Sequence, residues 1–158
     1  MLRSLRAFFQ RKPPAIRITI DADGVRRALQ GYIESSTDEP EVLAIAKTHH
    51  ALPLWRDMGG VLYLQPDGHI IASTWDVPGR VKPVADIRPH RDMLHAARAK
   101  AGRKYPEIQG LTPEKGPGAV PCRSSDGHGN LLGMSIQPGD VLCGCGGLGW
   151  LPEPPEPR

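Results

Sequence analysis

The sequence predicts an α+β fold, made of a small antiparallel sheet, three or four short helices and a C-terminal cysteine-bearing hairpin. Two observations lead to this class. Three segments place their apolar residues at the 3.6-residue period of an amphipathic helix. Between the second and the third of them, the stretch VLYLQPDGHIIAST has the pattern of a β-hairpin, with proline and glycine in its turn.

The N-terminal segment, residues 1–14, has the pattern of a basic amphipathic arm. Two leucines and two phenylalanines have helical spacing among arginines and a lysine, and two prolines end the pattern. Such an arm either docks on a membrane surface or a partner, or it packs on its own domain or frays. We expect the α+β core domain to follow over residues 15–110. It opens with AIRITI, whose alternating isoleucines predict a half-buried strand.

Two helices are expected next, each with a recognisable N-terminus. Asp21 or Asp23 can cap the first helix, because a carboxylate accepts the free backbone N–H groups of the first turn. Asp38 is the expected cap of the second helix, with Pro40 tolerated in its first turn. Both helices carry one apolar stripe, so both are expected to pack on a common core.

The hairpin is expected to pair residues 61–64 with residues 69–74 through the turn PDG. Another strand is predicted around residues 81–87. A third helix should run from about residue 90 to residue 101. We expect it to stop at Gly102, because glycine adopts the left-handed conformation that commonly ends a helix.

Length, cysteine content and charge limit the kinds of protein that this chain can be. The 158 residues are enough for one ordinary domain with its own core, so no disulfide framework is required. The three cysteines all lie between positions 122 and 145, and no secretion signal opens the chain, so we expect a cytoplasmic protein. No apolar run reaches the roughly 20 residues of a membrane span. A net charge of +3 does not by itself indicate a nucleic-acid partner.

Two imperfect copies of one pattern hold the cysteines. In CRSSDGHG, Cys122 is followed by Ser125, where a second cysteine belongs, and then by two glycines in register. In LCGCGGLG, Cys145 is in register and Cys143 is displaced by one position. This pattern resembles the C-x-x-C-x-G-x-G motif in the zinc domain of DnaJ-type co-chaperones, over residues 122–150 only. The resemblance implies a metal knuckle, in which glycines allow positive φ and a close approach of the backbone to sulfur.

Each copy lacks one thiol, so the usual ligand set of that family is incomplete. One zinc ion can still be held if His128 joins the three cysteines, because zinc accepts Cys3His in tetrahedral geometry. That zinc would be structural, since no coordination position stays open for catalysis. The alternative is a metal-free relic, in which the glycines merely form the turn. The expected metal ligands are Cys122, His128, Cys143 and Cys145, within a linker and degenerate knuckle over 111–150 that is followed by an extended tail over 151–158.

The sequence has no H-E-x-x-H, no G-x-S-x-G and no phosphate-binding glycine loop, so we predict a non-catalytic protein. Two helices followed by LPLWRDMGG are similar to the SUKH-type superfamily of bacterial toxin-immunity proteins, through Leu-Pro and the glycine pair. This resemblance implies a module that binds another protein. Exposed aromatic and arginine side chains dominate such interfaces. The expected partner-binding residues are Trp55, Arg56, Trp75 and Arg91.

The alternative function is that of a nucleic-acid-associated zinc-knuckle protein that uses the third helix. RPHRDMLHAARAKAGRK holds many cations against a single acid, which phosphates would attract. Long basic side chains on the solvated face of a helix are equally ordinary. No aromatic residue is interleaved with them for base stacking, so a protein partner is favoured. The cations of this alternative are Arg88, Arg91, Arg98 and Lys100.

Overall fold

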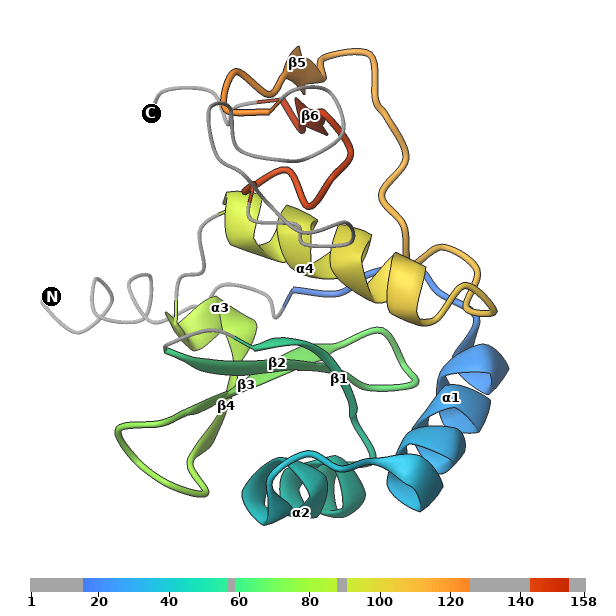
Figure 1. Cartoon of the computed structure of the whole chain (residues 1–158), viewed down its shortest axis with the longest axis vertical. Helices are drawn as coiled ribbons and strands as arrows, with labels where there is room; N and C mark the ends of the chain where they lie inside the picture. The colour runs from blue at the N-terminus through green and yellow to red at the C-terminus, as the bar shows by residue number, and fades with distance from the viewer. Residues whose placement is uncertain (1–15, 57–58, 88–90, 126–142, 154–158) are drawn as a thin grey trace, which may run out of the picture.

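The computed structural model describes residues 16–56, 59–87, 91–125 and 143–153, and it confirms the α+β class (Figure 1). Four antiparallel strands form one sheet in the order β1-β2-β3-β4, and β5 pairs with β6 in a second, two-stranded sheet. In chain order the elements are α1 (Ala22–Ser35), α2 (Pro40–His49), β1 (Leu52–Arg56), β2 (Gly60–Leu64), β3 (Ile70–Thr74), β4 (Val81–Pro83), α3 (Val84–Ile87), α4 (Arg91–Lys104), β5 (Val120–Pro121) and β6 (Trp150–Leu151).

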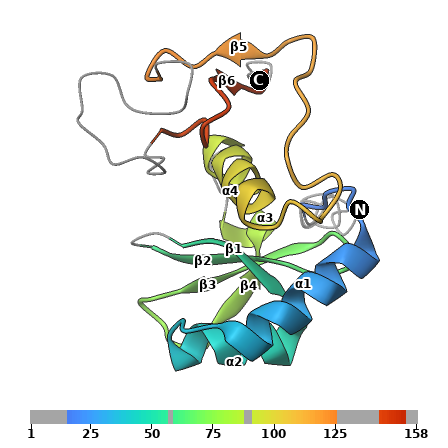
Figure 2. The ribbon, with the colours of Figure 1, turned by 45° about the vertical axis from the view of Figure 1, so that its right-hand side comes forward.

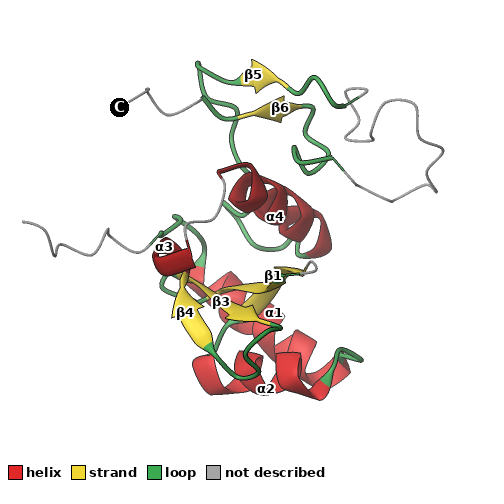
Figure 3. Cartoon of the chain, turned by 90° about the vertical axis from the view of Figure 1, so that its left-hand side faces the viewer, coloured by secondary structure: helices red, strands yellow, loops and turns green. Residues whose placement is uncertain are grey.

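The elements are stacked in layers. Helices α1 and α2 lie on one side of the four-stranded sheet, α4 lies on the other side, and the β5–β6 unit lies beyond α4 (Figures 1 and 2). A view from the side shows the same order of layers (Figure 3). Because helices cover both faces of the sheet, Val61–Leu64 and Ile70–Ser73 are buried along their whole length. This explains why the two central strands are continuously apolar rather than alternating.

The first helix begins as predicted, whereas the cap predicted for the second is wrong. The Asp21 carboxylate accepts the N–H of Gly24 at 3.0 Å and caps α1. The N-cap of α2 is Glu39, which makes no side-chain capping bond within the described part of the chain. Asp38 instead accepts the hydroxyl of Tyr32 at 2.8 Å. That carboxylate therefore links α1 to the start of α2 through a tertiary contact, which a local capping pattern does not reveal.

The predicted hairpin is confirmed as β2 and β3. Gly68 has φ +89° in the turn, and an added Cβ would lie 2.2 Å from the carbonyl oxygen of Ile18, so the position accepts only glycine. The strand predicted over 81–87 is only partly correct. It ends at Pro83, and the chain then forms α3, because Val84 turns into the core with no exposed surface.

Two more segments differ from the prediction at the sheet. The expected strand in AIRITI is reduced to one isolated bridge between Arg17 and His69, although its isoleucines do pack against the core. Conversely, the sequence did not predict β1, which contains Pro53. It lies at the edge of the sheet, with a break in register between Pro53 and Trp55, which is where a strand tolerates proline.

The predicted stop of the third helix at Gly102 is wrong, since α4 continues to Lys104. An alanine Cβ at position 102 would lie 2.1 Å from Oγ1 and 3.2 Å from Cα of Thr112. The glycine therefore lets the following segment cross close over the helix. That segment adds Ile108 and Leu111 to the core, with 4% and 0% of their surface exposed.

Helix α4 is packed on two faces by small side chains. Ala97 and Ala101 belong to the core that α4 shares with the sheet. Ala96 and Ala99, also buried, lie against Gly146 of the C-terminal unit. Because alanine side chains are small, the sheet and the C-terminal unit can both pack closely against α4. The helix therefore connects these two layers. The arm over 1–14 lies outside the described residues, and none of the described helices combines the length and apolar character that crossing a bilayer requires.

Candidate metal centre

The pairing of β5 with β6 brings the two cysteine segments together. Val120 pairs with Leu151, and Pro121 pairs with Trp150. Directly after β5, the N–H of Cys122 donates to the carbonyl oxygen of Gly149 at 2.9 Å. The first cysteine is thereby fixed beside the turn that carries the other two, although about twenty residues separate them along the chain.

The three cysteines form one buried cluster. Cys122, Cys143 and Cys145 have 9%, 2% and 0% of their surface exposed, and their sulfur atoms all lie within 4.8 Å of one another. The sulfur atoms of Cys122 and Cys143 are 3.1 Å apart, and no disulfide joins any of the three. Three sulfur ligands at this spacing can hold a metal ion. The convergence expected from the sequence is therefore confirmed for the three cysteines.

Tight turns hold each sulfur in place. The N–H of Ser125 donates to the carbonyl oxygen of Cys122 at 3.3 Å, and the N–H of Gly146 donates to that of Cys143 at 2.9 Å. Gly146, Gly147 and Gly149 have φ values of +64°, +91° and +76°, which L-residues rarely adopt. The predicted use of glycine for positive φ is confirmed at these positions.

Their surroundings shift the pKa values of the Cys143 and Cys145 thiols in opposite directions. Burial is the main cause that raises the pKa of Cys143. Burial acts in the same sense on Cys145, but the N–H groups of Gly149 and Gly147 donate to its sulfur, with further contributions from Cys143 and Ser125, and together they lower its pKa. Backbone N–H groups aimed at sulfur stabilise a thiolate, which is the form that binds metal.

The C-terminal unit is seated on α4 through glycine and histidine. A Cβ added at Gly146 would lie 2.6 Å from Cβ of Ala99 and 2.8 Å from the carbonyl oxygen of Ala96. His95, 5% exposed, donates through Nε2 to the carbonyl oxygen of Trp150 at 2.9 Å, and the two rings meet edge to face at 4.7 Å. The sequence did not predict this role of His95. Its only local signal is a histidine among alanines, which does not identify its partner.

The fourth predicted ligand, His128, lies outside the described residues, so the Cys3His set stays a prediction. Among the predicted partner-binding residues, the side chain of Arg91 lies outside the described part of the structure. Arg56 forms ion pairs with Asp38 and Glu39, and its guanidinium lies 5.8 Å from the ring centre of Trp75. The structure thus brings Arg56 and Trp75 together.

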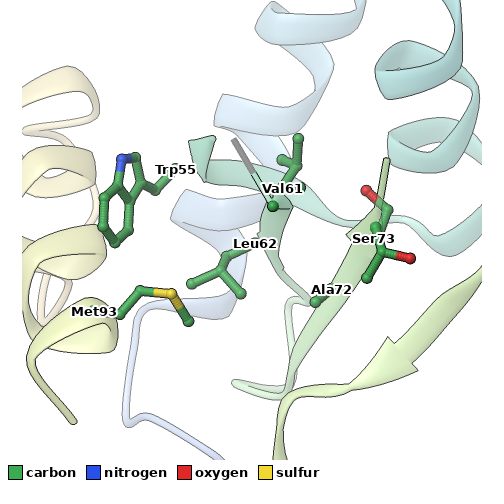
Figure 4. A pocket seen from close by; sticks show the side chains of 9 residues that line it. Trp55, Val61, Leu62, Ala72, Ser73 and Met93 are labelled. Atoms are coloured by element: carbon green, nitrogen blue, oxygen red, sulfur yellow. The ribbon is translucent and has the colours of Figure 1, made fainter. Parts of the chain in front are cut away.

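Trp55 lies on the α4 side of the sheet, apart from that pair. Lys100 lies over its ring at 4.9 Å. Together with Leu62 and Met93, Trp55 borders an apolar cavity of about 190 Å³ between α4 and the sheet (Figure 4). Because successive side chains of a strand point to opposite faces, Trp55 and Arg56 do not share one surface.

Two cations of the nucleic-acid alternative make contacts within the chain. Arg98 donates to the carbonyl oxygen of Gly110 at 3.0 Å, and burial lowers its pKa. Lys100 lies over Trp55, as described above, and burial lowers its pKa as well. Arg88 and the side chain of Arg91 lie outside the described residues. These contacts do not favour a phosphate-binding stripe along α4.

No protein-family model, curated protein or solved structure matches this chain. The resemblances to the DnaJ-type zinc domain and to SUKH-type immunity proteins therefore stay predictions from the sequence.

Proposed function

We propose that this protein is a non-catalytic binding module whose C-terminal unit is held together by one structural zinc ion. The ligands are the thiolates of Cys122, Cys143 and Cys145. The zinc fixes β5 and β6 on α4, and the layer formed by the sheet and its helices serves to bind another protein.

The observation that carries the metal proposal is the burial of three sulfur atoms within 4.8 Å of one another. Among the described residues, these cysteines with Leu151 are the whole apolar cluster of the C-terminal unit. So small a core does not balance the entropy lost when its loops are ordered. A metal bound by the folded form supplies the missing free energy, as in other small metal-dependent units.

Zinc is favoured over other divalent ions by the ligand type. Thiolates are soft ligands, and sites rich in cysteine are typical of structural zinc. Burial of all three sulfur atoms also excludes water from most of the ion's surroundings. The metal-free relic offers no comparable reason for three thiols to converge in one cluster.

The tryptophan and arginine side chains on the sheet and its helices support the protein-binding role. Tryptophan and arginine dominate binding energy in protein interfaces, and here they occur as the Arg56–Trp75 pair and as Trp55 beside its cavity. The SUKH-type resemblance of the sequence supports the same role.

The test of the metal proposal is elemental analysis of protein that is expressed and purified without a metal-binding tag. We expect about one zinc per chain, and we expect Cys122→Ser, Cys143→Ser and Cys145→Ser each to lose it. Ser124→Ala, at an exposed neighbouring position, is the matched control and should retain the metal. Wild-type protein that contains no metal, and that binds none when zinc is added, contradicts the proposal.

A further inference from the structure

We propose that the cysteine cluster is a redox switch, in which hydrogen peroxide joins Cys122 to Cys143 as a disulfide and the zinc is released. Cys145 stays a free thiol in the oxidised form. This regulation rests on the proposed zinc site, whereas the choice of Cys122 and Cys143 follows from the geometry of the cluster by itself.

The first observation is the distance between the two sulfur atoms, which are 3.1 Å apart and not bonded. Two thiolates of a tetrahedral zinc site, each about 2.3 Å from the metal, are about 3.8 Å apart. A disulfide bond is about 2.05 Å long. The observed distance lies between these two values, so a movement of about 1 Å or less leads from it to either state.

The second observation is where the two residues lie in the fold. Cys122 directly follows β5, and Cys143 lies 21 positions further along the chain, where it begins the turn closed by the N–H of Gly146. Because β5 pairs with β6, a bridge between these cysteines joins the two segments of the C-terminal unit where they already meet. A bridge between Cys143 and Cys145 would instead close over a single residue, which restricts the dihedral angle that a disulfide requires.

The third observation is the unequal burial of the three thiols. Cys143 and Cys145 are almost fully buried, whereas Cys122 keeps 9% of its surface exposed. Oxidation of a cysteine depends on its access to the oxidant. A small oxidant such as hydrogen peroxide therefore reaches Cys122 first, and Cys143 is the neighbour that completes the bridge.

The reaction has two steps. The sulfur of Cys122 attacks one oxygen atom of the peroxide, the O–O bond breaks, and a sulfenic acid forms while hydroxide leaves. The sulfur of Cys143 then attacks the sulfur of Cys122, and a second hydroxide leaves as the disulfide forms. In total, two thiolates, one hydrogen peroxide and two protons give one disulfide and two waters, and the two electrons pass from sulfur to the peroxide. Loss of two of its three thiolate ligands leaves the cluster unable to retain Zn²⁺, whose oxidation state does not change.

The experiment treats zinc-loaded wild type with a small excess of hydrogen peroxide in buffer without reductant. Released zinc is measured with a chromophoric indicator, free thiols are then alkylated, and the disulfide is located by mass spectrometry of peptides. We expect one disulfide, between Cys122 and Cys143, together with about one released zinc and an alkylated Cys145. A thiol reductant should restore three thiols and the binding of zinc.

Variants test the choice of the pair. Cys145→Ser should still form the bridge, although it is expected to lose the zinc. Cys122→Ser and Cys143→Ser should each form an internal disulfide at least about tenfold more slowly than wild type. Ser124→Ala, at an exposed neighbouring position, is the matched control and should behave as wild type does.

The outcomes separate this inference from the proposed function. Zinc-loaded wild type that joins Cys143 to Cys145, or that is oxidised without forming a disulfide, overturns the inference and leaves the proposed function intact. Retention of zinc after the bridge has formed overturns it as well. Wild type that binds no zinc but joins Cys122 to Cys143 supports the assigned pair and contradicts the proposed function.

Discussion

At the scale of single residues, the glycines around the cysteines have different tasks. Gly146 has φ +64°, and its α-hydrogen faces Ala96 and Ala99 of α4 at a distance that leaves no space for a methyl group. Gly144 is exposed, and an added Cβ would meet no described atom within 4 Å. Composition alone treats the two glycines as equivalent. Their surroundings in the fold make one essential and the other replaceable.

Gly146→Ala should therefore destabilise the protein by about 1–3 kcal/mol, because it combines an unfavourable φ with overpacking against α4. Gly144→Ala should change the free energy of unfolding by less than about 0.5 kcal/mol. Urea unfolding of both zinc-loaded variants, followed by tryptophan fluorescence, measures the difference. Equal losses in the two variants would contradict the close packing of Gly146 on α4.

At the scale of secondary structure elements, α4 differs from the other helices because both of its sides are covered. Its residues 97 and 101 face the sheet, and its residues 96 and 99 face the C-terminal unit. The segment near Thr112 crosses it at Gly102. Helix α1, by contrast, keeps an exposed side, on which an added Cβ at Gly31 would meet no described atom within 4 Å.

This contrast predicts opposite signs for the same substitution in two helices. Gly31→Ala should stabilise the protein by about 0.5–1 kcal/mol, because alanine reduces the backbone freedom of the unfolded chain and favours helix. Gly102→Ala should gain the same stabilisation from helix propensity. It should nevertheless destabilise the protein by about 1 kcal/mol overall, since Thr112 must move away from the new methyl group. Thermal or urea unfolding of the two variants measures both changes. Stabilisation by Gly102→Ala would show that Gly102 is not needed for the crossing.

At the scale of the whole molecule, the described part of the chain has two apolar clusters of very unequal size. The main core is built from α1, α2, the four-stranded sheet, one face of α4 and the segment up to Leu111. The second cluster consists of the three cysteines packed with Leu151. We expect the main core to fold by itself, whereas the second cluster should depend on the proposed metal.

Removal of zinc with a strong chelator under reducing conditions should therefore unfold the molecule only in part. We expect residues 119–125 and 143–151 to lose protection from hydrogen exchange, while β2, β3 and α1 keep theirs. Mass spectrometry of peptides after exchange, with and without zinc, measures this difference. Loss of protection across the four-stranded sheet would contradict the independence of the main core. A control with zinc restored should recover the original pattern.

Features that depend on a few neighbouring residues were predicted well. The cap at Asp21, the turn at Gly68 and the positive φ of the glycines after Cys145 are all confirmed, because each is decided by local backbone geometry. Predictions failed where a distant contact overrides the local rule. Asp38 bonds to Tyr32 instead of capping α2, and Gly102 accommodates Thr112 instead of ending α4.

By itself, the sequence determined the α+β class, the helical and hairpin segments, and the residue types that can bind a metal. Only the tertiary structure decided that Cys122 meets Cys143 and Cys145, and that His95 fixes the C-terminal unit on α4. It also decided that the segment of Trp55 and Arg56 joins the sheet as its edge strand, which places these two side chains on opposite faces. The physical reason is the sequence separation of the residues that interact. Periodicity, caps and turns depend on residues a few positions apart, whereas a cluster assembled from distant segments depends on how whole layers pack.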